Sequence, residues 1–390
     1  MAKTTTYSME PMLPREGDKE LENLALDLVA KSQALAVRLN PQLEKSIGDL
    51  VRSMNCYYSN LIEGHHTHPI EIEQALNDNY SINPEKRNLQ LEARAHIEVQ
   101  AYIDQAEISD EISSLQFICS IHKKFYDLLP DELKWVGSSS ASKRKKVEAG
   151  KLRDGDVQVG QHIAPAASDL ESLLLRYQEV YDFTSLSKLR SIIAVAAAHH
   201  RFVWIHPFYD GNGRVVRLLS HAYLKQLGIG SSIWSVSRAL ARNVQEYKTL
   251  LMAADGPRQG DYDGRGNLSE KALKDFCVFF LGAAIDQVEF MDSLLEPISF
   301  RERVSQHIQM EITKGALPRG SLALIKEVIL RGEVERGTVA EIVDYSPRQA
   351  RTILSKLLEY GILTSSSPRG AVRLCFPVKV LEYWFPRLYA

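Results

Sequence analysis

Residues 206–217 read HPFYDGNGRVVR and combine several reactive groups in one short stretch. His206 brings an imidazole, and Asp210 brings the one carboxylate of the stretch. The Gly-Asn-Gly run at 211–213 comes next, and small residues at a helix start let backbone N–H groups face an anion. This order of groups predicts a phosphate-binding turn with a base beside it.

Two helices are predicted to flank this turn. Residues 189–200 are nearly all apolar, which indicates a central, buried helix that ends shortly before His206. A second helix is predicted over about 213–227. Arg214 and Arg217 are three residues apart on it, so both guanidinium groups face one side and can grip phosphate oxygens.

The chemistry that these groups predict is transfer of a nucleotide phosphate group to a hydroxyl. Imidazole titrates near ~6.5, so His206 can accept a proton at neutral pH. Asp210 is expected to bind Mg²⁺, which prefers oxygen ligands and commonly lies between phosphates. The chain has no G-x-x-x-x-G-K-[ST] motif and no kinase motif set, which argues against P-loop enzymes and ordinary kinases.

The stretch resembles the signature of the Fic family, H-P-F-x-[DE]-G-N-G-R-x-x-R, and matches every defined position of it. The resemblance implies a mainly α fold, a helical core with a small β-hairpin flap. It also implies a protein adenylyltransferase, which moves AMP from ATP to a Tyr, Thr or Ser hydroxyl of a target protein.

By this resemblance His206 is the general base, Asp210 holds Mg²⁺, and Asn212 with the loop amides holds the α-phosphate. Arg214 and Arg217 would hold the outer phosphates. The residues expected around ATP are, in full, Glu63, Arg201, His206, Pro207, Phe208, Tyr209, Asp210, Gly211, Asn212, Gly213, Arg214, Arg217, Asn243 and Tyr247, the last two on the ribose and adenine side.

The flap is expected to bind the target chain by strand addition. A short hairpin is predicted between Gly137 and Pro165, where two glycines flank a Val-Gln-Val run. The residues expected in the flap are Val157, Gln158, Val159 and Gly160.

A second resemblance concerns SNLIEG at 59–64, which is similar to the inhibitory pattern of the family, [ST]-x-x-x-E-[GN]. Its residues are Ser59, Glu63 and Gly64. A glutamate that points into the phosphate pocket would pair with an arginine, by resemblance Arg217. It would then repel the γ-phosphate, so the resemblance implies an enzyme that restrains itself.

We expect three regions along the chain. Residues 1–110 would form an N-terminal helical region with the inhibitory helix, 111–298 the Fic domain, and 299–390 a winged helix-turn-helix-like domain. The helices expected in the first two regions begin near Glu20, Pro41, Pro84, Ile112, Asp169, Leu189, Gly213, Arg238 and Ser269.

The C-terminal region has the order helix, helix, helix and hairpin, which is typical of a winged helix-turn-helix. The third helix would start at Ser346-Pro347, a favoured N-cap and first helical residue. Basic residues exceed acidic ones by five in this region, and Arg348, Arg351 and Arg369 lie on the expected recognition helix and wing. DNA contact and a packing or dimerisation role are both open here.

Composition excludes several classes. The chain has 390 residues, 45% of them hydrophobic, and a net charge of −2, as in an ordinary globular protein. Its four cysteines are far apart, which argues against zinc ribbons and disulfide frameworks. We expect no signal peptide, no membrane span and a cytoplasmic location. His65, His66 and His68 are expected in a polar loop, and the basic run 143–146 in a solvated one.

Two other functions remain open beside the adenylyltransferase. One is a DNA-binding regulator whose core senses a nucleotide, and the other is an enzyme that removes AMP with the inhibitory glutamate positioning water. The intact His206 and both arginines favour an enzyme, because a sensor needs no base. The expected partners are ATP and a protein with an exposed hydroxyl side chain, and a homodimer is open.

Overall fold

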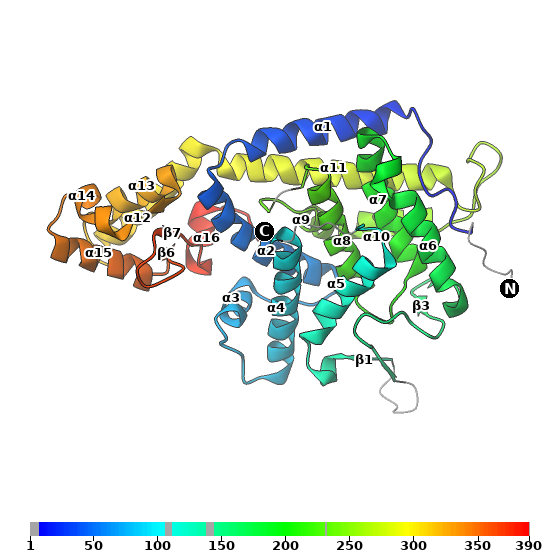
Figure 1. Cartoon of the computed structure of the whole chain (residues 1–390), viewed down its shortest axis with the longest axis horizontal. Coiled ribbons are helices and arrows are strands. Elements are labelled where there is room, and N and C mark those ends of the chain that lie inside the picture. Colours follow the sequence, from blue (N-terminus) through cyan, green and yellow to red (C-terminus); the bar gives the residue numbers. More distant parts are fainter. Residues whose placement is uncertain (1–7, 106–110, 138–143, 231, 390) are drawn as a thin grey trace. The chain divides into compact units, whose positions relative to one another are not determined.

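The computed structural model describes residues 8–105, 111–137, 144–230 and 232–389, and in them it is mainly helical with a few short strands (Figure 1). This agrees with the expected fold class. The chain divides into two compact units. The first comprises Met1–Ser32, Asn55–Ser231 and Ser235–Gln287, and the second comprises Gln33–Met54, Ser232–Trp234 and Val288–Ala390.

The first unit contains the 206–217 stretch. Three helices have residues in both units, namely α1 (Lys19–Ala36), α2 (Pro41–Ile62) and α11 (Glu270–Leu295). The other helices of the first unit are α3 (Pro69–Leu76), α4 (Pro84–Gln105), α5 (Leu115–Asp127), α6 (Leu170–Tyr181), α7 (Lys188–Ile205), α8 (Asn212–Gln226), α9 (Ser237–Arg242) and α10 (Val244–Ala254).

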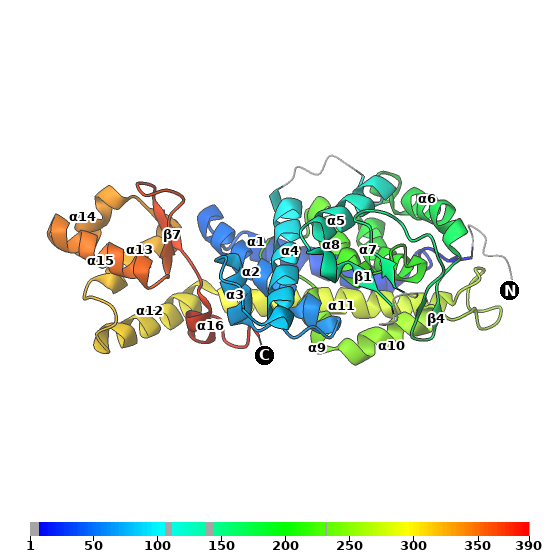
Figure 2. The ribbon, with the colours of Figure 1, turned by 90° about the horizontal axis from the view of Figure 1, so that it is seen from below.

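Helix α7 is the centre of this unit. It lies beside α6 and α8 in both views (Figures 1 and 2). Every side chain from Ser191 to Phe202 on it is buried, because the segment is apolar around its whole circumference. Ser187 caps its N-terminus by accepting a hydrogen bond from the Arg190 amide at 3.2 Å. The prediction of a buried helix ahead of His206 is confirmed.

An N-terminal arm before α1 packs on the same unit. Met9 and Met12 are buried. The carbonyl of Met12 accepts a hydrogen bond from the Tyr181 hydroxyl at 2.6 Å, and the carbonyl of Glu10 accepts one from the Leu268 amide at 2.9 Å. These main-chain contacts hold the arm without any regular secondary structure.

Two small hairpins project from this unit. In one, β1 (Trp135–Val136) pairs with β2 (Lys145–Lys146), and in the other, β3 (Gln158–Val159) pairs with β4 (His162–Ile163), both antiparallel. The second is the predicted hairpin. The first was not predicted: Lys145 and Lys146 are exposed, as expected, but lie in a short strand and not in a loop, whereas Lys143 lies outside the described residues.

One helix prediction needs correction, and one helix was not predicted. The helix expected over 238–254 is broken at Asn243, which has φ −112° and ψ 34° and separates α9 from α10. Helix α3 follows the polar loop at 65–68 and was not predicted. Its first residue is Pro69, and His68 stands at its N-cap.

The second unit ends the chain. Its further elements are α12 (Pro297–Thr313), α13 (Ser321–Arg331), β5 (Glu333–Val334), α14 (Val339–Val343), α15 (Pro347–Glu359), β6 (Leu363–Thr364), β7 (Val372–Leu374) and α16 (Val378–Trp384). The strands form one antiparallel sheet in the order β5-β7-β6. The predicted helices α13, α14 and α15 and strands β6 and β7 are present, whereas β5 and α16 were not expected.

The N-cap predicted at Ser346 is also present, since its hydroxyl accepts a hydrogen bond from the Gln349 amide, and the Ser346 amide donates to the side-chain oxygen of Gln349. Among the described residues, no helix has the length and apolar character needed to cross a membrane.

Candidate functional site

The stretch 206–211 forms a tight turn between α7 and α8. His206 ends α7 in the left-handed region with φ 51° and ψ 60°, and Gly211 precedes α8 with φ 82°. A side chain at Gly211 would also be crowded, because an added Cβ would lie 2.9 Å from the ring of Tyr126. Glycine is therefore required here by conformation and by space.

Asn212 closes the turn from inside. Its side-chain oxygen accepts a hydrogen bond from the Phe208 amide at 2.9 Å, and its side-chain nitrogen donates to the Phe208 carbonyl at 2.8 Å. The residue is buried. The sequence assigned Asn212 to the α-phosphate, and that assignment stays a prediction; in the structure both polar atoms of its side chain bind the backbone of Phe208, so Asn212 also holds the loop.

Phe208 anchors the turn. It is fully buried and stacks on His122 of α5, with ring centroids 3.9 Å apart and planes 10° from parallel. His122 in turn accepts a hydrogen bond from the Gly150 amide at 2.9 Å. Burial lowers the pKa of His122 to about 4, so this ring is a neutral packing element.

His206 is suited to accept a proton. Burial, together with the positive potential of His162 and Arg153, lowers its pKa to about 4. The imidazole is therefore neutral at pH 7, which is the state that a general base requires. Its backbone carbonyl accepts a hydrogen bond from the Arg153 guanidinium at 2.8 Å.

Asp210 presents a partly exposed carboxylate, with 41% of the side chain accessible. It accepts a hydrogen bond from the Tyr126 hydroxyl at 2.6 Å and pairs with Arg214 at 3.2 Å. No group of three or more His, Cys, Asp or Glu residues suited to a metal occurs in the described part of the chain. A single accessible carboxylate nevertheless fits Mg²⁺, which often takes one protein carboxylate plus phosphate oxygens.

Glu63 reaches the same place from the end of α2. Its Oε1 accepts a hydrogen bond from Arg217 Nη2 at 2.6 Å. Arg217 also donates to the Ser59 hydroxyl at 2.9 Å and to the Ser59 carbonyl at 3.1 Å. Gly64 then ends the segment with φ 85°. The structure thus brings together all the residues of the inhibitory pattern and the second arginine of the motif.

The carboxylate of Glu63 lies at the N-terminus of α8. A Cβ added to Gly213 would overlap its Oε1. Burial alone would raise the pKa of Glu63, but the charges of Arg217 and Arg214 outweigh burial and lower it. An ionised carboxylate therefore occupies the point where the helix dipole and backbone amides favour an anion.

Arg214 meets a carboxylate that sequence analysis missed. Glu92 on α4 is 6% exposed and forms an ion pair with Arg214, and its other oxygen lies 2.7 Å from Nδ1 of His65. The guanidinium also lies over the Phe125 ring, 5.0 Å from its centroid. No spacing rule links positions 92 and 214, so the sequence carries no signal for this pair.

Two of the other predicted ATP residues lie apart from the phosphate turn. Arg201 is fully buried and donates to the carbonyl of Pro11 at 3.1 and 2.7 Å. Asn243 donates to the carbonyl of Ala239 at 3.0 Å. Among the described contacts, neither residue meets the 206–217 stretch.

Tyr247 lies closer to the site. Its hydroxyl is 2.8 Å from Nε2 of the buried His199, and the residue interacts electrostatically with Arg217 and Glu63. Burial raises the pKa of Tyr247 to about 12, so its hydroxyl stays protonated. Tyr247 is therefore a buried, neutral neighbour of Arg217 and Glu63.

The hairpin β3–β4 stands beside the turn with an exposed edge. Val159 and Ile163 are 48% and 70% exposed, and Val157 and Gly160 belong to the same hairpin. His162 fastens the hairpin, since its ring lies 2.9 Å from the carbonyl of Trp204 and 3.2 Å from the carboxylate of Asp255.

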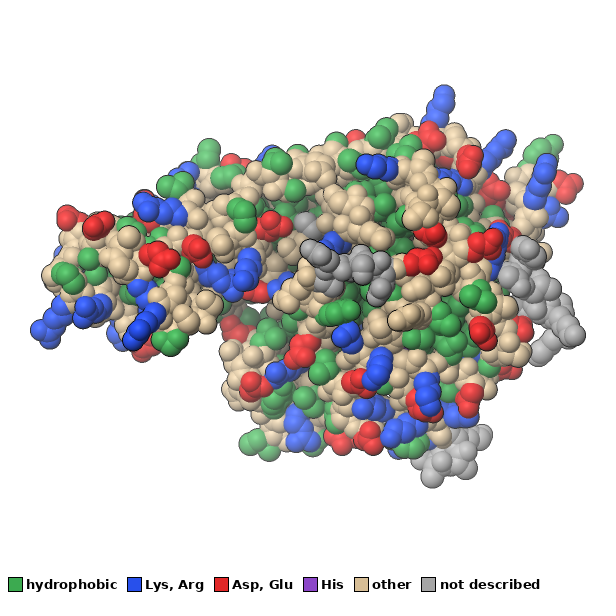
Figure 3. Space-filling model, viewed as in Figure 1, with side chains coloured by type: hydrophobic (Ala, Val, Ile, Leu, Met, Phe, Trp, Pro, Cys, Tyr) green, Lys and Arg blue, Asp and Glu red, His purple; other side chains and the backbone are tan. Residues whose placement is uncertain are grey.

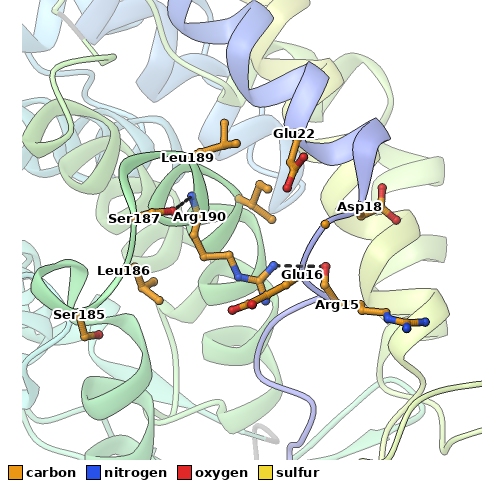
Figure 4. Close-up of a pocket in the computed structure, with 11 residues that line it drawn as sticks. Arg15, Glu16, Asp18, Glu22, Ser185, Leu186, Ser187, Leu189 and Arg190 are labelled. Atoms are coloured by element: carbon orange, nitrogen blue, oxygen red, sulfur yellow. Dashed lines mark hydrogen bonds between the residues drawn. The ribbon is translucent and has the colours of Figure 1, made fainter.

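A separate groove lies where the N-terminal arm passes the start of α7. Arg190 points into it and donates to the carbonyl of Arg15 at 3.5 Å, beside Ser187 and Glu16 (Figure 4). It contains none of the predicted site residues.

Comparison with known proteins agrees with this site. The model of the Fic/DOC family matches residues 112–224, which contain the whole turn. The chain is therefore similar to the Fic/DOC family over these residues. A protein adenylyltransferase Fic from Drosophila erecta is 40% identical over 82 residues, which is 21% of this chain and 17% of that protein. Its namesake from Drosophila mojavensis is 32% identical over 139 residues, or 35% and 28% of the two chains.

The matched regions thus span less than a third of these relatives. The fold extends further than the sequence similarity. A crystal structure of a Fic family protein from Desulfovibrio desulfuricans has a TM-score of 0.55 at 20% identity and covers 93% of this chain and 98% of its own. Glu63 and Glu92 lie outside the residues that the family model matches.

Proposed function

We propose that this chain is a protein adenylyltransferase that transfers AMP from ATP to a hydroxyl side chain of a target protein and is restrained by Glu63. The observation that carries the proposal is the ionised Glu63 carboxylate at the N-terminus of α8, bound by Arg217. A site that holds a carboxylate between a helix start and a guanidinium is built for an oxyanion such as phosphate.

The proposed reaction is a displacement at the α-phosphorus of ATP. The target hydroxyl oxygen forms the new P–O bond, and the bond from the α-phosphorus to the bridging oxygen of the β-phosphate breaks. Pyrophosphate leaves with that electron pair, and the hydroxyl proton passes to His206. The imidazole of His206, the first residue of the turn, is neutral, which supports this role.

The backbone amides at the start of α8 would hold phosphate oxygens, and Arg214 and Arg217 would neutralise the outer phosphates. Asp210 would hold Mg²⁺ together with phosphate oxygens. The metal would supply charge neutralisation for the departing pyrophosphate. Tyr126 and Arg214 both donate to Oδ2 of Asp210 and so orient the carboxylate.

The hairpin β3–β4 would align the target by strand addition along its exposed edge. Val157, Gln158, Val159 and Gly160 would contribute the strand that pairs with the target chain. Target binding would then present the hydroxyl beside His206, because Trp204 at the end of α7 holds the hairpin through His162.

Glu63 restrains the reaction by occupying the anion site. Arg217 cannot bind the γ-phosphate while it binds Glu63, and two negative groups at one helix start repel each other. The restraint should therefore be removed by replacing Glu63 with glycine, which leaves Arg217 and the helix start free.

The test compares wild type, Glu63→Gly, and Glu63→Gly combined with His206→Ala. Each purified chain is incubated with ATP and Mg²⁺ and weighed intact, and a lysate is labelled with α-³²P-ATP. Glu63→Gly should add AMP units to itself or to lysate proteins well above wild type, and the double variant should add none. Equal incorporation by wild type and Glu63→Gly would show that Glu63 does not restrain the site.

The same assay separates the alternatives. An enzyme that removes AMP would lower the mass of a premodified protein by AMP units, and only while Glu63 is intact. A nucleotide sensor would bind ATP but transfer nothing in any variant. Only the gain of AMP by Glu63→Gly, lost again with His206→Ala, supports the transferase.

A second candidate function concerns the last unit, for which we propose DNA contact through α15. Its buried side is apolar, with Ile353, Leu354 and Leu357. Arg348 and Arg351 are exposed on it, and neither forms an ion pair within the described residues. Figure 3 shows Lys and Arg side chains, in blue, where Figure 1 labels α15. Such exposed guanidinium groups suit phosphate and base contacts.

The test is fluorescence anisotropy of the full chain with a mixed-sequence DNA duplex at several salt concentrations. Arg348→Ala with Arg351→Ala should weaken binding and flatten the salt dependence, by about 0.9 in slope for each phosphate that the variant no longer neutralises. Arg319→Ala, an exposed arginine outside α15, is the control. Binding that is absent at low salt would leave this unit a packing or partner-selection role.

A further inference from the structure

Arg153 is a buried cation whose guanidinium, among the described residues, donates its hydrogen bonds to main-chain oxygens. It is 2% exposed and forms no ion pair within the described residues. Its Nη1 donates to the carbonyl of Gly155 at 2.9 Å, and its Nη2 donates to the carbonyl of Pro165 at 2.5 Å. Gly155 lies three residues before β3, and Pro165 lies two residues after β4.

The rest of the guanidinium faces the catalytic turn. Nε donates to the carbonyl of His206 at 2.8 Å, and Nη2 lies 3.4 Å from the carbonyl of Ile205. The backbone amide of Arg153 also donates to the carbonyl of Pro207 at 3.0 Å. One residue therefore ties both ends of the hairpin to the last residue of α7 and to the base itself.

These contacts matter most at His206. This residue has a left-handed backbone, which a side chain other than glycine adopts only when its surroundings impose it. The hydrogen bonds from the Arg153 side chain to the carbonyls of Ile205 and His206 hold the two peptide groups on either side of the His206 Cα, and these peptide groups set its φ and ψ. The direction of the imidazole follows from that backbone.

We infer that Arg153 is a positioning residue that couples the target-binding hairpin to the general base. The inference deepens the proposed transferase function and rests on it. In this arrangement the flap and His206 share one anchor, so a target strand held by the hairpin meets the base at a fixed separation. Catalysis is sensitive to such placement, because a shift of about 1 Å can cost roughly 100-fold in rate.

The informative substitution is Arg153→Lys. Lysine keeps the positive charge but has one nitrogen, which cannot reach all the carbonyls that Nε, Nη1 and Nη2 of Arg153 bind. In the Glu63→Gly background, self-modification by Arg153→Lys should be slower by about 10- to 100-fold. The ATP concentration for half-maximal rate should stay the same, because the contacts of the α8 start do not involve Arg153.

Amide hydrogen exchange of the full chain supplies a readout that is independent of activity. In Arg153→Lys, peptides covering 154–166 and 203–209 should exchange faster than in wild type, while those from α6 and α8 should not change. This measurement decides the inference even if Glu63→Gly incorporates no AMP, in which case the proposed function alone fails.

The matched control is Arg190→Lys. Arg190 also binds main-chain carbonyls, those of Pro14 and Arg15, but at the opposite end of α7 (Figure 4). It should leave the exchange of both segments and the rate unchanged. The inference is overturned if Arg153→Lys matches the control in exchange and rate, or if its exchange rises throughout the unit, since that would be general loosening.

Discussion

The ion pair of Glu92 with Arg214 yields a quantitative prediction about stability. Glu92 is 6% exposed, and both carboxylate oxygens have partners, Arg214 on one side and His65 on the other. Replacing Glu92 with alanine leaves the buried guanidinium with Asp210 at 3.2 Å and the charge of Glu63. The chain should therefore unfold more easily, although no catalytic atom has been removed.

The size of the effect follows from the burial. Removing one partner of a buried ion pair costs about 3–5 kcal/mol, and the remaining Asp210 interaction places Glu92→Ala near the lower end, at about 3 kcal/mol. Glu92→Gln keeps the shape and an accepting oxygen, so it should cost about 1 kcal/mol, the difference between a charge-assisted and a neutral hydrogen bond. In a chain of 390 residues these values correspond to a lower melting temperature by about 4–6 °C and about 1–2 °C.

The melting temperatures of both variants are measured by circular dichroism during heating, without nucleotide. Glu98→Ala is the control, since Glu98 lies on the same helix in an ion pair with Arg94 whose side chains are 41% and 33% exposed. An exposed pair contributes about 0–1 kcal/mol, so the control should melt close to wild type. The reasoning is refuted if Glu92→Ala melts with the control, or if the Gln variant falls as far as the Ala variant.

Three further predictions concern the turn and the hairpin. Burial alone would lower the pKa of His162, but Asp255 and a main-chain carbonyl outweigh it and raise the pKa. The charged ring therefore fastens the hairpin at pH 6 and releases it as the pH rises past the raised pKa of His162. AMP transfer by the Glu63→Gly chain should decline over that pH range, and a pH series should find no such decline in His162→Gln. Gly213→Ala should abolish ATP binding even with Glu63→Gly, because the added methyl group occupies the anion site; calorimetric titration with ATP that finds unchanged affinity would contradict this. Asp210→Asn should raise the Mg²⁺ concentration needed for half-maximal AMP transfer, because a neutral amide is a weaker ligand than a carboxylate, and an unchanged magnesium titration would remove Asp210 from the metal site.

Much of the architecture could be predicted from local patterns. The apolar run of α7 specifies a buried helix, and Ser346-Pro347 specifies the start of α15 through capping alone. Strands of two residues, such as β1 and β2, have too few side chains for an alternating pattern. Helix α3 is only eight residues long and follows a polar loop, so periodicity did not reveal it.

The site divides in the same way. The phosphate-binding turn could be predicted because its chemical groups lie within a few residues of one another in the sequence. The contact between the Asn212 side chain and the Phe208 backbone could not be predicted, because a side-chain amide can bind either a phosphate or a neighbouring peptide group. The position of Arg201 shortly before His206 suggested a pocket residue. In the structure its side chain on α7 donates to the carbonyl of Pro11.

The chemical groups of the site follow from the sequence alone: a base, a carboxylate, an anion-binding helix start and two guanidinium groups, all specified by short-range spacing. The partner that each buried charge meets depends on the folded chain. Glu63 and Glu92 come from helices far from the turn in the sequence, and each pairs with a different arginine. A buried charge must find an opposite charge or a hydrogen-bonding group wherever the fold provides one, and packing, not spacing, sets that choice.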